Sequence, residues 1–378
     1  MPDFSRYFDC NATTPMSSVA REAWIEANGR FWQNPSSLYR EAGMAKQELE
    51  RCREEVADHL GIDEPERVIF TSGATEANNA IIRYLAESRK GRLLVSAIEH
   101  PCVEAPSQAW FGEERCHAIG VDPVSGGIDL TEVEVQLRAG GVAAVSVMAA
   151  NNETGTLQPW KELAELCRNH AVPFHSDAAQ WIGKLPSGEL GECDFLTGSG
   201  HKFGGGKGVG FLVIPEEADA FHGLIGGPQE GGRRAGTENL PAVIAMVAAL
   251  TERSDSVLEE VAAANAVGRD AFEREMTAIG MKLIGADGPR LWNTSMFVLP
   301  HTKNLKWLTR LSQRGFSVST GSACSAGRGN PSRVMAAMGL DFDEMGRVMR
   351  VSGGWETTGE DWSDLSAAIR EVAGELTQ

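Results

Sequence analysis

Residues 198–210, with the sequence GSGHKFGGGKGVG, place Lys202 directly after a predicted strand and among closely spaced glycines. A lysine amine that is removed from water loses its proton more readily, and it can then form a Schiff base with an aldehyde cofactor. The segment does not fit a phosphate-binding loop, because Lys207 is followed by Gly208 where Ser or Thr is required. It does not fit a dinucleotide fingerprint either, because its glycines precede a strand and not a helix. Taken alone, the pattern is more typical of a solvated loop lysine.

A carboxylate and an anion-binding turn follow two other predicted strands. Asp177 ends the strand PFHSD, and pyridoxal phosphate needs a carboxylate beside its ring nitrogen so that the protonated ring can accept electrons. Residues 71–76 (TSGATE) join a strand to a helix, and the free N–H groups of such a turn, with the Thr75 hydroxyl, suit a phosphate group. For each of these two features, an ordinary helix cap is the alternative interpretation.

Two residues near the C-terminus have side chains that suit an amino-acid substrate. The guanidinium of Arg350 matches a carboxylate with two parallel hydrogen bonds, which a lysine cannot do; a surface salt bridge is the alternative. Cys324 lies in residues 320–331 (TGSACSAGRGNP), where the neighbours are small and polar. Because such neighbours do not bury a thiol, this pattern favours a reactive cysteine over a packed one.

The elements that must position these residues alternate between strand and helix. Short apolar segments predict strands at 68–70, 93–96, 142–148, 173–175, 195–197 and 209–214, and helical patterns occur at 45–60, after residue 76 and at 159–170. Strands that read as continuous apolar runs are typical of a sheet buried on both faces. The βαβα order predicts an α/β fold with a mainly parallel sheet.

Ligands of such sheets bind at the carboxyl ends of the strands. Polar clusters follow five predicted strands, at 71–76, 99–100, 151–153, 177–180 and 199–202, and we expect them to form one site. After Asn239 the pattern changes to a long helix at 242–279 and mixed α+β elements, with strands near 291–299 and 316–319. We place a change of domain inside that helix.

The composition restricts the class of function. With 35 Lys and Arg against 52 Asp and Glu in 378 residues, the chain carries a formal charge of −17, which repels phosphate backbones and argues against nucleic acid as a partner. The N-terminus shows no targeting signal, and the longest apolar stretch, 240–250, is shorter than the about 20 residues of a membrane span. Seven widely spaced cysteines without a CxxC pair argue against a disulfide framework or structural zinc. We therefore expect a reducing, cytoplasmic location and no membrane.

Nine segments, in the same order along the chain, resemble the motifs of the pyridoxal-phosphate-dependent cysteine desulfurases of the class V aminotransferase superfamily, NifS/IscS type (group I). They are DCNATTP at Asp9, TSGATEANN at Thr71, EHPCV at Glu99, NNETG at Asn151, SDAAQ at Ser176, GSGHKFGGGKGVG at Gly198, GGRRAGTEN at Gly231, STGSACSAG at Ser319 and MRVSGG at Met349. The resemblance implies the fold type I of pyridoxal-phosphate-dependent transferases. In that fold, residues 13–255 form a large cofactor domain, and residues 1–12 and 256–378 form a small α+β domain that carries Cys324 and Arg350.

The resemblance also implies a role for each matching residue in cofactor binding. Lys202 binds the cofactor covalently and moves protons, Asp177 pairs with the ring nitrogen, Gln180 bonds the phenolic oxygen, and His100 stacks on the ring and assists proton transfer. The phosphate is bound by a group of small and polar residues, with one contribution from the other subunit of a homodimer: Ala74, Thr75, Ser199 and His201, with Thr237 of the partner subunit.

For the substrate, the resemblance implies L-cysteine, with its carboxylate bound by Arg350 and Asn152 and its sulfur taken by Cys324 as a persulfide. The products are L-alanine and sulfur for an acceptor protein or a small thiol, as in iron–sulfur biogenesis. A C–S or C–Se lyase acting on selenocysteine or cystine is one alternative, and an inactive cofactor-binding sulfur-transfer or regulatory subunit is another. Basic residues such as Arg328 and Arg333 are candidates for acceptor docking.

Two departures from the family pattern bear on these expectations. Gly353 stands where the family more often has Leu, which loosens the predicted carboxylate pocket. The chain ends at Gln378, soon after its last predicted helix, so we expect no long tail for binding an iron–sulfur scaffold.

The remaining cysteines divide into two groups. Cys52 and Cys167 lie on helical patterns and Cys193 precedes a strand, so we expect all three to be packing residues. Cys10 and Cys102 are placed to approach the cofactor, where a redox or sulfur-relay role competes with simple packing. Metal binding by the pairs His100/Cys102 or Cys116/His117 is disfavoured, because neither has a convergent second pair.

Overall fold

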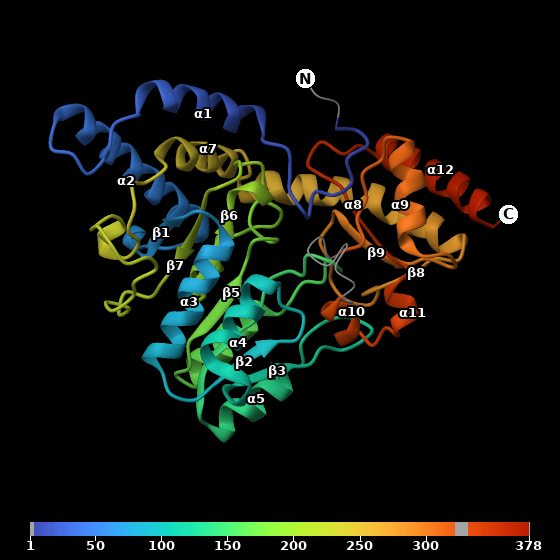
Figure 1. Ribbon diagram of the computed structural model, residues 1–378, viewed down its shortest axis with the longest axis horizontal. Coiled ribbons are helices and arrows are strands. Elements are labelled where there is room, and N and C mark those ends of the chain that lie inside the picture. The colour runs from blue at the N-terminus through green and yellow to red at the C-terminus, as the bar shows by residue number, and fades with distance from the viewer. Residues whose placement is uncertain (1–3, 322–331, 378) are drawn as a thin grey trace.

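The computed structural model describes residues 4–321 and 332–377, so the predicted nucleophile Cys324, and Arg328 with it, lie outside the described residues. The described chain contains a seven-stranded sheet with the order β1-β7-β6-β5-β4-β2-β3 and a three-stranded sheet with the order β10-β9-β8. Figure 1 shows the larger sheet on the left and the smaller one on the right, with helix α8 running from one part to the other.

Five neighbouring strands of the large sheet are parallel. The pairs β3–β2, β2–β4, β4–β5 and β5–β6 are parallel, whereas β7 lies antiparallel between β6 and β1. The predicted mainly parallel α/β fold is therefore confirmed. The strands are β1 (Val68–Thr71), β2 (Arg92–Ser96), β3 (Cys116–Ile119), β4 (Val142–Ser146), β5 (Phe174–Asp177), β6 (Phe195–Ser199) and β7 (Gly210–Val213).

Helices cover both faces of the large sheet, because successive side chains of a strand point to opposite faces. In β2, Leu94 packs into the core formed with α1, α2, α5, α6 and α7, whereas Leu93 and Val95 pack into the core formed with α3 and α4. The bounds of these helices are α1 (Ser18–Arg30), α2 (Arg40–Leu60), α3 (Ala74–Ser88), α4 (Pro101–Arg115), α5 (Leu130–Ala139), α6 (Trp160–Asn169) and α7 (Leu240–Thr251).

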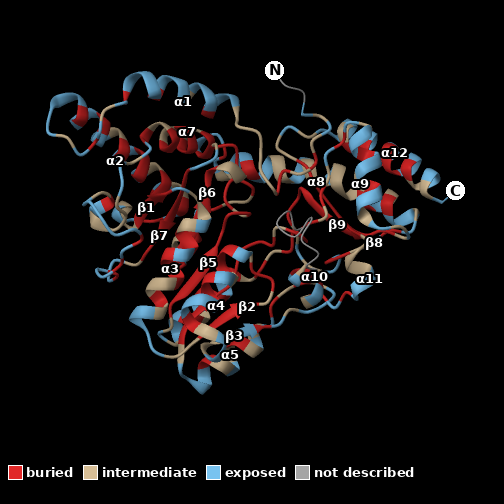
Figure 2. Ribbon diagram, in the orientation of Figure 1, coloured by how far each residue is buried: buried red, intermediate tan, exposed pale blue. Residues whose placement is uncertain are grey.

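The small antiparallel sheet has its own core. Phe297 of β9 and Val351 of β10 pack with Phe272, Trp307 and Trp362 from three helices, and Figure 2 shows these buried strands in red beneath exposed helix faces. The elements are β8 (Lys282–Leu283), β9 (Thr294–Val298), β10 (Val348–Ser352), α8 (Asp255–Ala278), α9 (Asn304–Gln313), α10 (Arg333–Ala337), α11 (Phe342–Met345) and α12 (Gly359–Leu376).

Two predicted elements were wrong. The helix expected over 242–279 is two helices, because Ser254 has an extended backbone at the start of α8. The strand expected at 316–319 is absent from the described elements; instead Ser317 bridges to Tyr7 and Ser319 to Arg350, so alternate residues pair with different segments and no continuous ladder forms. Helix α1 and strand β3 are among the elements for which no bounds were predicted.

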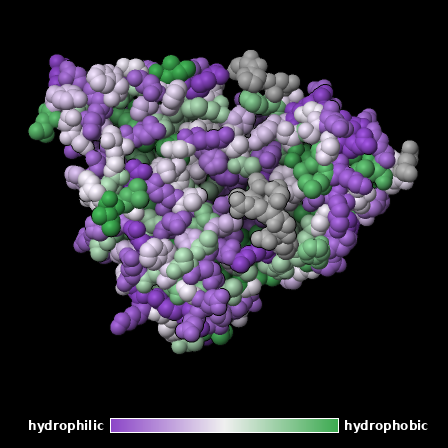
Figure 3. Space-filling view, in the orientation of Figure 1, coloured by the Kyte–Doolittle hydropathy of each residue, from purple (hydrophilic) through white to green (hydrophobic). Residues whose placement is uncertain are grey.

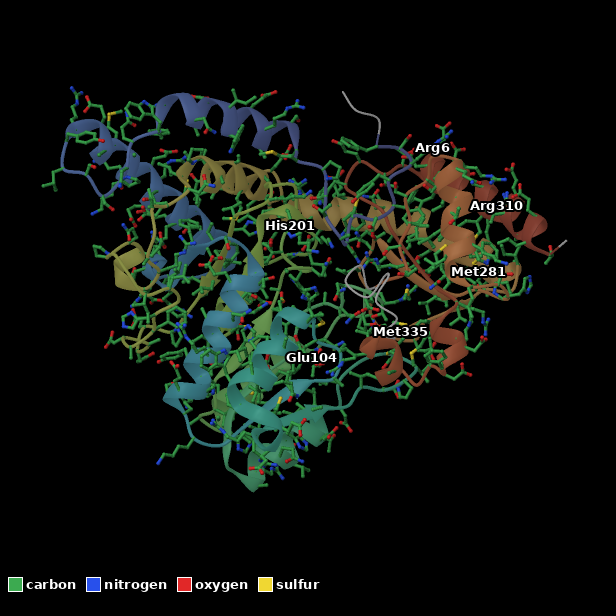
Figure 4. The ribbon with its side chains drawn as sticks, in the orientation of Figure 1. Arg6, Glu104, His201, Met281, Arg310 and Met335 are labelled. Atoms are coloured by element: carbon green, nitrogen blue, oxygen red, sulfur yellow. The ribbon has the colours of Figure 1, made fainter. Side chains whose placement is uncertain are left out.

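The face of the molecule seen in Figure 3 is mainly hydrophilic, and hydrophobic residues occur on it in scattered groups. None of the helices in the described ranges is long and apolar enough to cross a membrane. Arg333, one of the basic residues considered for docking, is paired with Glu104 of α4, which Figure 4 labels.

Candidate active site

A cavity of about 490 Å³ lies at the carboxyl ends of the parallel strands. All five polar clusters expected there contribute to its lining, because the five strands that precede them end at the same edge of the sheet. Arg350, from β10 of the small sheet, completes the wall, and Figure 4 shows His201 near the junction of the two parts. The predicted site residues that line the cavity are Ala74, Thr75, His100, Asn152, Asp177, Gln180, Ser199, His201, Lys202 and Arg350.

Lys202 lies in a short 3₁₀ turn directly after β6. Its amine donates hydrogen bonds to the carbonyl oxygens of Asn11 at 2.6 Å and Ala12 at 3.0 Å. The pKa of Lys202 is lowered to about 8, mainly by burial and also by the charge of Arg350, while Asp177 opposes the shift. Near pH 7 about a tenth of this amine is therefore neutral, far more than of an ordinary lysine, and the neutral form is the nucleophile.

Asp177 is held by donors on both of its oxygens. Oδ2 accepts from the Asn78 side-chain nitrogen at 2.8 Å, and Oδ1 accepts from the Ala179 backbone N–H at 3.0 Å. Hydrogen bonds to a carboxylate stabilise its charged form. These two hydrogen bonds fix the position of the Asp177 carboxylate in the cavity wall, and a carboxylate is what a protonated ring nitrogen needs.

Asn78 is in turn oriented by a buried hydrogen-bond chain. Its Oδ1 accepts from Thr197 Oγ1 at 2.9 Å and from His175 Nε2 at 3.1 Å, so its nitrogen must face Asp177. His175 Nδ1 lies 2.8 Å from Ser146 Oγ, and burial lowers the pKa of this histidine to about 4. His175 is therefore neutral, with its proton on Nε2 and its Nδ1 accepting from the serine.

His100 caps the first turn of α4. Its Nδ1 accepts from the Cys102 backbone N–H at 3.1 Å and lies 2.9 Å from Cys102 Sγ. Burial lowers the pKa of His100, and burial raises the pKa of the Cys102 thiol well above its ordinary value. In the neutral imidazole, Nδ1 is thus the acceptor and Nε2 carries the proton.

Neither cysteine that was expected near the cofactor is favoured as a thiolate. Cys102 Sγ lies 3.6 Å from Asp177 Oδ2, whose charge adds to the effect of burial. Cys10 is buried, and burial raises the pKa of its thiol to about 12. Since the thiolate is the reactive form, these environments favour hydrogen bonding and packing over sulfur relay. The three cysteines predicted to be packing residues are completely buried: Cys52, Cys167 and Cys193.

The anion-binding end of the cavity is the start of α3. Among the described residues, no side chain caps the first turn of this helix, and Ala74 and Thr75 line the cavity there. His201 Nδ1 lies 3.1 Å from Thr13 Oγ1, and burial together with the charge of Lys202 lowers the pKa of His201 to about 4. Free N–H groups at a helix N-terminus suit a phosphate group. Thr237 is exposed and does not line the cavity of this chain.

Arg350 is nearly completely buried, with 1% of its surface exposed. One of its terminal nitrogens donates to the carbonyl oxygens of Asn152 and Gly321, both at 2.8 Å, and the other pairs with Asp9 Oδ1 at 2.6 Å. Its Nε has no partner among the described residues. Arg350 is thus held in place by backbone carbonyls and one carboxylate, at the side of the cavity that Asn152 also lines.

Sequence reasoning assigned no role to three buried residues that organise this site: Asn11, Asn78 and Lys184. Two of them lie within segments that resemble family motifs, Asn11 in DCNATTP and Asn78 in TSGATEANN. Lys184 follows Gln180 by four residues, a spacing that brings side chains together on a helical turn. That spacing is the one local signal that could have identified Lys184.

The residues present fit pyridoxal phosphate. One cavity combines an amine of lowered pKa, a carboxylate held in position by two hydrogen bonds, and an uncapped helix N-terminus for the phosphate. Within residues 4–321 and 332–377, no group of three or more His, Cys, Asp or Glu is placed to hold a metal ion.

Comparison with known proteins gives consistent similarities. The family model described as Aminotransferase class-V matches residues 6–365. A cysteine desulfurase of Rhodobacter capsulatus is 36% identical over 380 residues, which cover 98% of this chain and 97% of that protein. The structure of a NifS-like protein from Rickettsia africae has a TM-score of 0.87 and 29% identity, covering 97% of this chain and 99% of the other. A structure described as SspA in complex with cysteine has a TM-score of 0.80 and 30% identity, covering 93% and 100%. These similarities confirm the resemblance seen in the nine motifs.

Proposed function

Because this chain belongs to the class-V aminotransferase family, we propose that it is a pyridoxal-phosphate-dependent cysteine desulfurase of the NifS/IscS type. The observation that carries the proposal is the cavity in which the amine of Lys202 and the carboxylate of Asp177 meet beside an uncapped helix N-terminus. Pyridoxal phosphate, when bound, supplies an electron sink for bonds around the substrate's α-carbon.

The cofactor would be held by the residues that line this cavity. Lys202 Nζ would bind it covalently and then, once released, take the α-proton of the substrate. Asp177 would pair with the ring nitrogen, and His100 would lie against the ring with its Nε2 proton available. Gln180 would donate a hydrogen bond to the phenolic oxygen. The phosphate would be bound by Ala74, Thr75, Ser199 and His201.

The substrate would be L-cysteine, a choice supported by the similar chain whose structure is described with cysteine. Arg350 and Asn152 would bind its carboxylate. The Cys324 thiolate would attack the substrate sulfur, the bond between that sulfur and the β-carbon would break, and protonation of the carbon would give L-alanine. Sulfur passes from one thiol to the other, so Cys324 becomes a persulfide and no external oxidant or reductant is consumed. The persulfide would then be passed to an acceptor protein or a small thiol.

The proposed assembly is a homodimer in which Thr237 of the partner subunit completes the phosphate site. This is supported by the exposure of Thr237, which leaves it available to a second copy. We place the domains at residues 13–255, and at 1–12 with 256–378, which is supported by the separate cores of the two sheets. A cytoplasmic location is supported by the six described cysteines, all of which are free.

The test is incubation of the purified holoenzyme with L-cysteine, with alanine measured and the peptide containing Cys324 weighed. We expect alanine to form and one extra sulfur atom to appear on that peptide. The matched variant is Cys324→Ala, which should bind the cofactor normally and lose desulfuration. Full turnover of cysteine by this variant would refute the persulfide mechanism and favour a C–S or C–Se lyase. A protein that takes up no cofactor would indicate an inactive subunit. Sedimentation tests the dimer, and a fully active monomer would refute it.

A further inference from the structure

Lys184 is a buried lysine that the chemistry proposed above does not use. It is 2% exposed and is not one of the residues that line the cavity. Its amine donates a hydrogen bond to Asn11 Oδ1 at 2.9 Å and another to Gln180 Oε1. A buried amine destabilises a protein unless it forms hydrogen bonds. The presence of a lysine at this buried position therefore needs an explanation.

The contacts of Lys184 determine which end of the Gln180 amide faces the cavity. The Gln180 oxygen is taken by Lys184, and the Gln180 nitrogen donates to the Asn11 carbonyl oxygen at 2.9 Å. Among the described residues this is the one bond of that nitrogen, so its second N–H is left for the cavity. A flipped amide would place its oxygen against the Asn11 carbonyl and its nitrogen against another donor, losing both hydrogen bonds.

Asn11 is itself fixed in one orientation. Its side-chain nitrogen donates to Thr294 Oγ1 at 2.8 Å and to the Asn152 carbonyl oxygen at 3.2 Å. Its side-chain oxygen must therefore face Lys184, where a donor is required. Hydrogen bonds are thus donated in one direction, from Lys184 to the Asn11 oxygen and from the Asn11 nitrogen to Thr294 of the small sheet.

The number of donors also matches. Burial lowers the pKa of Lys184 well below its ordinary value, and the nearby charge of Lys202 lowers it further. The described residues offer this amine two acceptors, which equals the number of N–H groups of a neutral amine.

We propose that Lys184 is a positioning residue that holds the Gln180 amide with an N–H donor directed into the cavity. This inference rests on the proposed function, in which that donor meets the phenolic oxygen of pyridoxal phosphate. Lys184 acts entirely through Gln180 and does not touch the cofactor. The same Asn11 carbonyl also accepts from Lys202, so one backbone group orients the amide and the cofactor-binding lysine together.

The test is a double-mutant cycle with Lys184→Met and Gln180→Ala in the holoenzyme. Two quantities are measured: the position of the visible absorption band of the bound cofactor, and the dissociation constant for pyridoxal phosphate. We expect Lys184→Met to shift the band as Gln180→Ala does and to weaken cofactor binding roughly tenfold, which corresponds to the loss of one hydrogen bond. In the double variant the effect should equal that of Gln180→Ala alone.

Lys161→Met is the matched control, because Lys161 is half-exposed and pairs with Glu189 at the surface; it should leave both quantities unchanged. Lys184→Gln keeps an N–H₂ group and serves if the methionine variant does not fold; its band should lie nearer the wild type than that of Gln180→Ala. An unshifted band in Lys184→Met, additive effects in the double variant, or a Lys184→Gln band at the Gln180→Ala position would overturn the inference. Failure of the wild-type protein to bind the cofactor would instead overturn the proposed function.

Discussion

Asn78 makes four hydrogen bonds beneath the cavity, and we predict that Asn78→Ala lowers the free energy of unfolding by about 3–5 kcal/mol. The side chain is completely buried, donates to Asp177 and Cys102, and accepts from His175 and Thr197. In the alanine variant, His175 Nε2 and Thr197 Oγ1 lose the one partner that the described residues give them. Each orphaned buried group costs about 1–3 kcal/mol, and the loss of a donor to Asp177 adds to this.

The matched control is the next residue of the same helix. Asn79 is exposed and donates one hydrogen bond to the Thr75 carbonyl oxygen at 2.8 Å. Both substitutions gain the same helix propensity from alanine, so Asn79→Ala should change the free energy of unfolding by less than about 0.5 kcal/mol. The difference between the two variants therefore isolates the buried hydrogen bonds.

The assay is urea unfolding followed by far-ultraviolet circular dichroism, with the visible band of bound cofactor recorded in parallel. Asn78→Asp gives a second comparison, because it places a carboxylate 2.8 Å from Asp177 and one of the two must then bind a proton. We expect this variant to bind the cofactor more weakly than the wild type. Equal unfolding midpoints for the Asn78→Ala and Asn79→Ala variants would show that the chain of hydrogen bonds does not stabilise the fold.

Three further predictions concern charge. The rate at which the cofactor-free protein takes up pyridoxal phosphate should be half-maximal near pH 8, because Lys202 must be neutral to react. Arg350→Gln should move this midpoint to higher pH, because it removes a positive charge that lowers the pKa of Lys202. Stopped-flow absorbance measures both midpoints, and equal midpoints would contradict the electrostatic explanation. Glu230→Gln should lower the free energy of unfolding by about 3 kcal/mol, because buried Arg53 then keeps only the half-exposed Glu50 as a charged partner. Changing both Arg53 and Glu230 to Met should recover much of the loss, and chemical denaturation measures both variants. The free energy of unfolding should fall as the pH drops from about 6.5 to about 4, because His175 binds a proton in the unfolded chain and not in the folded one. When the free energy of unfolding is measured across this pH range, a His175→Asn variant should show a shallower decline.

The convergence of polar clusters at one edge of the sheet was predictable, because ligands of α/β sheets bind at the carboxyl ends of the strands. Applying this rule requires only the positions of the strands in the sequence and the residues that follow each one. Asp177 ends β5 and Lys202 follows β6, and because these two strands are parallel neighbours, strand pairing brings the two residues to the same edge of the sheet. The helix break at Ser254 was harder to predict, because the helical pattern of the sequence continues across it. The bridges of Ser317 and Ser319 depend on segments far away in sequence, which local periodicity does not encode.

The residues without a predicted role share a physical feature. Asn11, Asn78 and Lys184 act on the site through other residues, and their partners lie between 4 and 283 positions away in the sequence. The sequence does not show whether an asparagine or lysine is buried and fully hydrogen-bonded or exposed, because the residue type is the same in both cases. Only the fold distinguishes Asn78 from its neighbour Asn79.

Residues 9–12 connect the two ends of the proposed reaction. Asp9 holds the guanidinium of Arg350, whereas the carbonyl oxygens of Asn11 and Ala12 hold the amine of Lys202. The lysine follows a strand of the large sheet and the arginine lies on a strand of the small sheet, so their separation depends on how the two sheets are joined. A four-residue segment that binds both groups fixes that separation more directly than contacts between the sheets. The positions of the Lys202 amine and the Arg350 guanidinium are therefore coupled through residues 9–12.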